Sequence, residues 1–391
     1  MPDIIYFDQI AATRPHEEAA AAMLPFLREN FANPSSLHQS GQSAHQAVEE
    51  ARQNVAQLIG AAPEEIVFTS SGSEANNLAV KGAALANQSQ GRHIITSAIE
   101  HYSVHHPLKN LERQGFEITH LPVDKNGLID PAAVTAAIGP ETVLVSIMYG
   151  NSEIGTLQPL AEIGKITRER GIIFHSDAVA AVGRIPVDVN RLHVDLLSLA
   201  GHQFYGPKGA AGLYVRKRTR IAPLIEGGLQ EDGRRAGTPD VAAIVGLGCA
   251  AQLAKIHLAE WSAHAQKLER RLRSQLAEKV SELIFTGHPE NRLPGHLSLC
   301  VKYIEGEGML LYLDMEGIAA SSGSACISQA LKSSYVLDAV GIDPADSQGS
   351  LVISLGQDNT DAEVDYFLSV FPPIIERLRQ MSPIYKGLRR Y

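Results

Sequence analysis

Short apolar runs alternate with segments of helical periodicity along the first two-thirds of the chain. The short runs predict strands because they are rich in β-branched residues, and apolar residues at a spacing of three to four predict helices. Strands are predicted at 4–7, 66–69, 93–96, 117–121, 142–148, 172–175, 195–199 and 210–215, and helices at 16–30, 43–58, 78–86, 104–113, 131–137 and 160–170. Repeated strand–helix units predict an α/β fold with a mostly parallel sheet and helices on both faces.

The last third of the chain has a different pattern. Residues 241–280 have helical spacing with few helix breakers, which predicts one long helix or a pair of helices. Beyond this segment, strands are predicted at 297–301 and 350–355, and helices at 308–315 and 362–381. We therefore expect a large α/β domain over 16–255 and a small α+β domain formed by 1–15 and 256–391.

Polar residues stand directly after several predicted strands. They are Ser73, His101, Asn151, Asp177 and His202. Ligands of open parallel sheets bind beyond the carboxyl ends of the strands, so we expect these side chains to share one cleft.

Two of these strand ends allow a simpler interpretation. The strand at 66–69 leads through a Ser/Gly turn into a helix, which is a site for anions, but Ser71 or Ser73 would also serve simply as the helix N-cap. The strand–loop–strand at 195–215 positions His202 between two buried runs, but it is equally compatible with a β-turn that carries a solvated His202 and Lys208.

Composition narrows the classes of function. The 391 residues carry 34 basic and 43 acidic side chains, a net charge of −9 that argues against nucleic acid as the main partner. Three cysteines without paired spacing fit a reducing cytoplasm. The N-terminus is not like a signal peptide, and no uninterrupted apolar run is long enough to span a bilayer. We expect a cytoplasmic protein without a membrane partner.

A set of short motifs carries a family resemblance through its order along the chain. The motifs are TSSGSEANN at 69–77, EH at 100–101, NSEIGT at 151–156, HSDA at 175–178, AGHQFYGPKG at 200–209, GGLQEDGRRAGT at 227–238 and SSGSAC at 321–326. This order resembles the cysteine desulfurases, which are pyridoxal-phosphate (PLP) enzymes of the class V aminotransferase fold. The resemblance covers 6–383 and implies a fold-type-I PLP-transferase architecture and a homodimer with its sites at the interface.

The resemblance implies roles for the positions that match the family pattern. Gly72 and Ser73 match the turn that holds the phosphate, His101 the imidazole that stacks on the pyridine ring, Asp177 the partner of the ring nitrogen and His202 a phosphate-side histidine; Thr238 matches a hydroxyl that reaches the phosphate of the neighbouring subunit. Cys326 matches the loop cysteine that accepts sulfur, and with His101 it completes the expected catalytic pair. Cys249 and Cys300 we interpret as buried small hydrophobes.

Other positions depart from the family pattern. Gln203 stands where the family has the lysine that forms the Schiff base with PLP, and an amide cannot form that bond. The phosphate, ring-oxygen and substrate contacts of the family fall on Ala200, Ser152, Ala180 and Val352. Val352 replaces an arginine whose contact with a substrate carboxylate would contribute about 1.5–3 kcal/mol. Lys208 belongs to the YGPKG turn that the family shares, so we expect it to be a surface lysine.

Three hypotheses follow from this mixture. The first is a cysteine desulfurase-like protein that lacks the usual PLP reaction and serves iron–sulfur assembly by docking a U-type scaffold or a sulfur acceptor, with Cys326 as persulfide carrier or as ligand of a shared iron–sulfur cluster. The second is an active cysteine desulfurase that binds PLP noncovalently or in which Gln203 is an engineered change. The third is an enzyme with a new ligand in a remodelled cleft.

Overall fold

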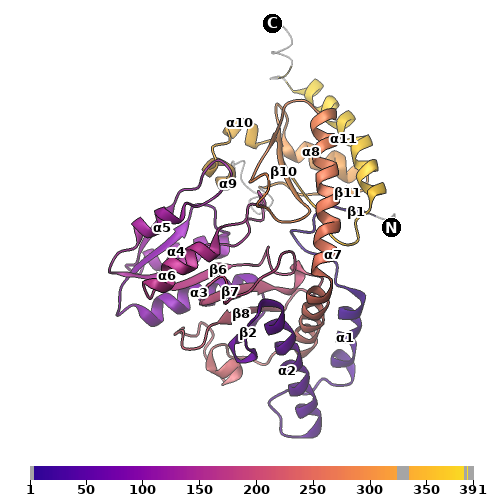
Figure 1. The fold of residues 1–391 in the computed structure, drawn as a ribbon. Coiled ribbons are helices and arrows are strands. Elements are labelled where there is room, and N and C mark those ends of the chain that lie inside the picture. The colour runs from indigo at the N-terminus through magenta and orange to yellow at the C-terminus, as the bar shows by residue number, and fades with distance from the viewer. Residues whose placement is uncertain (1–3, 324–333, 383–384, 386–391) are drawn as a thin grey trace.

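The structure is a computed structural model that describes residues 4–323, 334–382 and 385. The chain folds around a central sheet. It contains seven strands, in the order β2 (Ile66–Thr69), β8 (Ala211–Val215), β7 (Leu196–Ala200), β6 (Ile173–Asp177), β5 (Thr142–Ser146), β3 (His93–Ser97) and β4 (Glu117–Leu121). The strands from β7 to β4 run parallel, and only β8 pairs antiparallel with both of its neighbours. The predicted mostly parallel α/β sheet is therefore confirmed (Figure 1).

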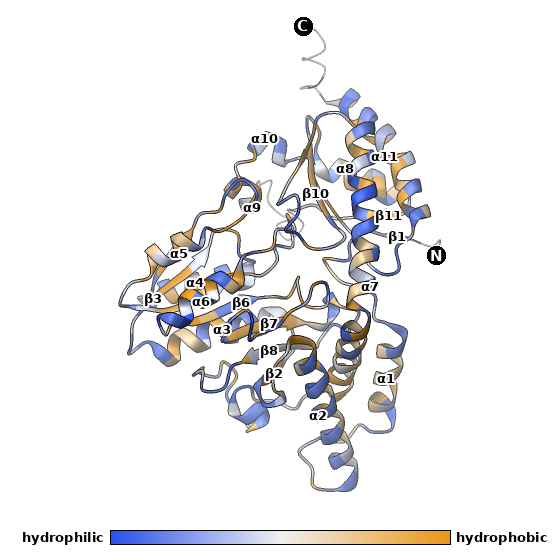
Figure 2. Cartoon of the chain, in the orientation of Figure 1, coloured by the Kyte–Doolittle hydropathy of each residue, from blue (hydrophilic) through white to orange (hydrophobic). Residues whose placement is uncertain are grey.

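Helices cover both faces of this sheet because successive side chains of a strand point to opposite faces. Val67 and Leu196 point into a core with α3 (Gly72–Asn87) and α4 (Tyr102–Glu112). Phe68 and Leu197 point into the opposite core. That core is completed by α1 (Glu17–Arg28), α2 (Gln39–Ile59), α5 (Pro131–Ala137) and α6 (Leu160–Glu169). Figure 2 shows the buried strands mostly in hydrophobic colours and polar residues along the outer side of α2.

The segment at 241–280 is one continuous helix, α7 (Val241–Lys279), rather than a pair. Its first half packs in the core of the large α/β part, whereas Leu268, Leu272 and Leu276 pack in a second core. By length and composition α7 could cross a membrane, although the sequence has no uninterrupted apolar run long enough to span a bilayer. However, 61% of its most apolar window is buried inside the fold, as in the core helix of a globular protein.

The second core belongs to a smaller α+β part. It contains a two-stranded parallel pair, β1 (Ile5–Tyr6) with β11 (Ile318–Ala319), and an antiparallel sheet in the order β12 (Ser350–Ser354), β10 (His296–Val301) and β9 (Leu283–Phe285). Its helices are α8 (Gly306–Met315), α9 (Tyr335–Ala339), α10 (Pro344–Ser347) and α11 (Asp361–Met381). The predicted mixture of the N-terminal strand with the last third of the chain is present, and the boundary at 255/256 stays a prediction.

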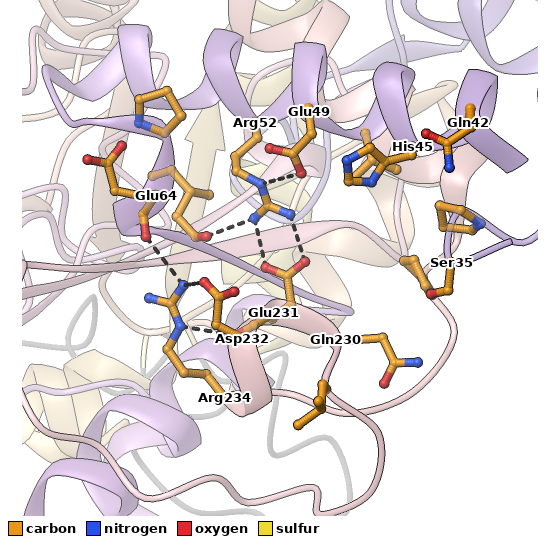
Figure 3. Close-up of a pocket in the computed structure, with 16 residues that line it drawn as sticks. Ser35, Gln42, His45, Glu49, Arg52, Glu64, Gln230, Glu231, Asp232 and Arg234 are labelled. Carbon is orange, nitrogen blue, oxygen red and sulfur yellow. Dashed lines mark hydrogen bonds and ion pairs between the residues drawn. The ribbon is translucent and has the colours of Figure 1, made fainter. Parts of the chain in front are cut away.

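An ion pair covers the open edge of β2, the strand at one end of the sheet. Arg52 on α2 contacts both carboxylate oxygens of Glu231, at 2.7 and 2.9 Å, and donates to the carbonyl of Ile66 at 2.8 Å. The backbone N–H of Phe68 donates to Glu231 Oε2 at 2.8 Å. Edge strands expose unpaired backbone groups, and here a carboxylate and a guanidinium occupy them. The pair lines a polar cavity of about 690 Å³ (Figure 3).

We expect this pair to stabilise the fold more than a surface ion pair does. Glu231→Gln should lower the free energy of unfolding by at least about 2 kcal/mol, because it weakens charged hydrogen bonds to two partly buried groups. Glu49 is the matched control, since it pairs with the same Arg52 at 3.1 Å but lies 40% exposed. Glu49→Gln should cost less than about 1 kcal/mol. Urea unfolding of both variants measures the difference, and equal losses would contradict a special role for Glu231.

Candidate active site

A cleft of about 390 Å³ lies between the carboxyl ends of the sheet strands and the small α+β part. Six of the predicted site residues line it: Gly72, Ser73, His101, Asp177, His202 and Gln203. Asn151 lines it as well, so the strand-end residues do share one cleft. None of these residues lines the larger cavity beside Arg52. The geometry therefore brings the predicted residues together, while the individual role of each stays a prediction.

A hydrogen-bonded network fixes the deepest carboxylate of the cleft. Asp177 ends β6, and its Oδ2 accepts from Asn76 Nδ2 of α3 at 2.6 Å, while its Oδ1 accepts from the backbone N–H of Val179 at 3.0 Å. Asn76 Nδ2 also donates to Ser103 Oγ at 2.8 Å, and Ser103 Oγ lies 2.7 Å from His101 Nδ1. Burial raises the pKa of Asp177, and the nearby His101 opposes that rise. Asn76 and Ser103 were not among the predicted site residues, although Asn76 falls in the motif at 69–77.

The turn at 70–73 presents a helix N-terminus to the cleft. Ser71 is the N-cap of α3 and accepts from the backbone N–H of Glu74 at 3.1 Å, which decides between the two capping serines. Ser73 is exposed and lines the cleft beside it. A Cβ at Gly72 would lie 2.6 Å from Cγ2 of Val179, which belongs to the turn after β6. The close approach of this turn favours glycine at residue 72. The free N–H groups and the dipole of this 16-residue helix favour an anion at this end.

Gln203 occupies the floor of the cleft in a short helical turn, η2 (Gly201–Gln203), directly after β7. Its Nε2 donates to the carbonyl of Ile10 at 2.7 Å, and its buried Oε1 has no hydrogen-bond partner. The preceding His202 also lines the cleft, and burial lowers its pKa, with a smaller effect of Lys208. Lys208 itself is exposed, as expected of a surface lysine. The interpretation of 195–215 as a strand–loop–strand that positions a site is thus supported over a solvated turn.

The wall opposite the sheet comes from the small part. Asp8 bridges to Ser354, and Ser321 pairs with Val352, whose backbone N–H donates to the Ser321 carbonyl at 2.7 Å. All of these except Ser354 line the cleft. Burial raises the pKa of Asp8, and a hydrogen bond from Ser321 opposes that rise. Asp8 was not predicted as a site residue, because only the tertiary fold brings the N-terminal strand to the cleft.

Two predicted residues are not among the described residues that line the cleft. Thr238 is exposed and lines a separate cavity of about 120 Å³ beside Thr69 and Arg235, and its contact with the phosphate of a neighbouring subunit stays a prediction. Cys326 lies outside the described residues. Cys300 is fully buried, as predicted, whereas Cys249 is only partly buried. Among the described residues no cluster of three or more His, Cys, Asp or Glu could hold a metal ion.

The comparisons with known proteins agree with this architecture. The model of the class-V aminotransferases matches residues 5–367, and the chain belongs to that family. Within it, the relatives place the chain among the cysteine desulfurases. A protein named cysteine desulfurase IscS from Methanosarcina thermophila is 48% identical over 97% of this chain and 94% of its own length, and one from Dictyoglomus turgidum is 46% identical over 97% and 96%. A solved structure of a NifS-like protein is 37% identical and superposes with a TM-score of 0.91, covering 96% of this chain and all of its own.

PLP is the cofactor of this family, and the cleft fits part of it. Asp177 offers a buried carboxylate to a protonated ring nitrogen, the N-terminus of α3 offers N–H groups to a phosphate, and His101 stands beside both. Asn76 Oδ1 is buried and has no hydrogen-bond partner, so it can accept a hydrogen bond from a bound group. The covalent attachment does not fit, because Gln203 carries no amine.

A second buried carboxyl stands behind the cleft and makes stability dependent on pH. Glu100 is fully buried and accepts from Ser97 Oγ at 2.6 Å and from the N–H of Met148 at 2.8 Å. Burial raises its pKa to about 8. Since the folded state retains this proton up to a higher pH than the unfolded chain, the free energy of unfolding should fall as pH rises from about 5 to about 8.

Glu100→Gln should remove this dependence, because a neutral amide oxygen can still accept both hydrogen bonds. We expect the melting temperature of the variant to exceed that of the unmodified protein by at least about 2 °C at pH 8, and by less at pH 5. The exposed Glu112→Gln is the control and should show no such pH-dependent gain. A constant difference between the melting curves at the two pH values would refute the assignment.

Proposed function

We propose that this protein is a cysteine desulfurase that acts in sulfur transfer for iron–sulfur cluster assembly and binds PLP noncovalently. The relatives named cysteine desulfurase IscS, which align over nearly the whole chain, favour retained activity on L-cysteine. The observation that carries the proposal is the Asp177–Asn76 pair beside the N-terminus of α3. The Asp177 carboxylate offers a site for a ring nitrogen, and the N-terminus of α3 offers a site for a phosphate. A hydrogen bond of 2.6 Å from Asn76 fixes the carboxylate.

The residues of this chain have separate tasks in that proposal. When bound, PLP withdraws electrons from the α-carbon of an attached substrate amine. Asp177 would offer its carboxylate to the protonated ring nitrogen, and Asn76 and the Val179 N–H keep Asp177 in place. His101 is oriented through Ser103 Oγ and the Ser103 N–H, which donates to His101 Nδ1 at 3.1 Å and so leaves the other ring nitrogen free to carry a proton. Cys326 is the proposed acceptor of the substrate sulfur.

Gln203 makes the mode of binding testable. PLP added to the purified protein should bind reversibly and leave on dialysis, and borohydride should not fix it to the chain. In Gln203→Lys, borohydride should fix one PLP per chain at residue 203, and alanine and sulfide production from L-cysteine should rise by at least about tenfold. Lys208→Gln is the matched control and should behave like the unmodified protein, since Lys208 is exposed outside the cleft. The proposal would be overturned if neither the unmodified protein nor Gln203→Lys binds PLP.

A second candidate function is favoured by a specific set of positions. Gln203, Ala180 and Val352 line the cleft without an amine or a guanidinium among them. These three residues favour a protein that does not turn over L-cysteine and that serves iron–sulfur cluster assembly by docking a partner protein. In this role Cys326 carries a persulfide or ligates a cluster shared with the partner.

An interaction assay separates the role of Cys326 from that of the cleft. An immobilised U-type scaffold protein should retain the purified chain, and Cys326→Ser should reduce by at least about tenfold the sulfur or iron–sulfur cluster that the complex holds, because a hydroxyl is a poor substitute for a thiolate. Cys249→Ser, on the partly buried face of α7, is the control and should have no effect. Equal loading of all three proteins would contradict a role for Cys326.

A further inference from the structure

Arg184, in the connection between β6 and β7, is a buried cation without an anionic partner among the described residues. It is 9% exposed, and no ion pair within residues 4–323, 334–382 and 385 includes it. Its Nη2 donates to the carbonyl of Gln9 at 2.7 Å, whereas its Nε is buried and has no hydrogen-bond partner. Burial lowers the pKa of Arg184, and the nearby Tyr205 opposes that shift. A guanidinium stays charged even so, and burying it is costly unless an anion compensates its charge.

Gln203 connects this cation to the cleft. It is 5% exposed and lines both the cleft of about 390 Å³ and a cavity of about 20 Å³ that Arg184 also lines. The orientation of its amide is fixed, because the carbonyl of Ile10 can only accept and therefore faces Nε2, at 2.7 Å. Oε1 is buried without a partner, and Nε2 carries a second N–H that the bond to Ile10 does not use.

The small cavity has room for one water molecule, which needs about 10–15 Å³. A water there can accept from the N–H of Arg184 Nε and donate to Gln203 Oε1, so that both unpartnered atoms are satisfied. A hydrogen-bonded chain of this kind polarises the amide and makes the second N–H of Nε2 a stronger donor. The charge of Arg184 thereby reaches a cleft in which no lysine or arginine is found among the described lining residues.

The amide of Gln203 also lies close to the strand that carries Val352. The carbonyl of Ile10 accepts from Gln203, and the N–H of Ile10 donates to Ser354 Oγ of β12 at 2.7 Å. Ser354 and Val352 are two residues apart and share one face of β12. Val352, 2% exposed, stands where the family resemblance places the arginine that binds a substrate carboxylate. A carboxylate in this region needs donors and positive charge to offset its lost hydration.

We infer that Gln203 and Arg184 bind the carboxylate of L-cysteine in place of the arginine missing at residue 352. Gln203 contacts the carboxylate through the second N–H of Nε2. Arg184 is a positioning residue, which orients and polarises the amide and supplies the positive charge. The inference deepens the proposed function, on which it rests for L-cysteine as the ligand. It accounts for the amide at residue 203 and the valine at residue 352 together, because one carboxylate contact replaces another.

Two thiols of the same size isolate the carboxylate contact. 3-Mercaptopropionate carries the carboxylate, its isostere 3-mercaptopropionamide is neutral, and neither has an amine that would react with PLP. Calorimetry with the full chain at pH 7 under reducing conditions, with and without added PLP, should give a Kd at least about tenfold lower for 3-mercaptopropionate. The inference is overturned if the unmodified chain binds the two thiols equally well.

Two variants assign the contact to its residues. Arg184→Met removes the charge, Gln203→Met removes the amide, and each should weaken 3-mercaptopropionate binding by at least about tenfold while changing that of 3-mercaptopropionamide by less than about threefold. Arg184→Lys, which restores a charge, should recover part of the loss. Arg191→Met is the control, because Arg191 belongs to the same connection but its side chain is 88% exposed, and it should bind both thiols like the unmodified protein.

A merely structural role of Arg184 would weaken the binding of both thiols alike, and that result would overturn the inference. Normal binding of 3-mercaptopropionate by a folded Arg184→Met would overturn it as well. Gln203→Met tests the same contact from the cleft side where Arg184→Met fails to fold.

The outcomes also separate this inference from the proposed function. Binding of PLP by a chain that does not distinguish the two thiols would refute the carboxylate contact and leave the proposed function standing. A preference for 3-mercaptopropionate in a chain that does not bind PLP would support the contact and refute the proposed function.

Discussion

The hydrogen bond from Asn76 to Asp177 is the contact on which the geometry of the cleft depends. It joins the end of a central strand to the first turns of α3 over 2.6 Å and holds a carboxylate that is almost fully buried. A buried carboxylate without such partners would be costly, and its pKa is raised even here. Because the same amide also donates to Ser103, the position of His101 follows from the position of Asp177.

The cleft combines a hydrogen-bonded network with buried polar atoms that have no partner. On the sheet side, Asp177, Ser103 and His101 form a connected network, and the helix N-terminus beside them is capped by Ser71. Asn76 Oδ1 and Gln203 Oε1 on the sheet side, and Asp8 Oδ1 on the opposite wall, are buried and have no hydrogen-bond partner. The sheet side thus keeps the buried carboxylate and the helix N-terminus that would hold a cofactor, and it also carries the amide of Gln203.

The long helix α7 determines how the two sides meet. Ala243 and Leu247 pack in the core of the large α/β part, and Leu268 and Leu276 pack in the core of the small one. One rigid element therefore anchors both cores and fixes the separation of the sheet from β12. The far edge of the sheet is closed in a different way, by the pair of Arg52 and Glu231 on β2. The Arg52–Glu231 pair does not line the cleft, whereas α7 also packs against η2, the turn that carries His202 and Gln203.

The sequence by itself determined the local elements and the family. Most strands, the helices around them and the sharing of one cleft by Ser73, His101, Asn151, Asp177 and His202 could be predicted, because periodicity and order along the chain are local information. Only the tertiary structure decided that 241–279 is a single helix, that Asn76 holds Asp177, and that Asp8 joins Val352 at the opposite wall. Residues 8 and 352 are brought together by strand pairing between distant segments, and no local pattern of side chains encodes which distant strands will pair.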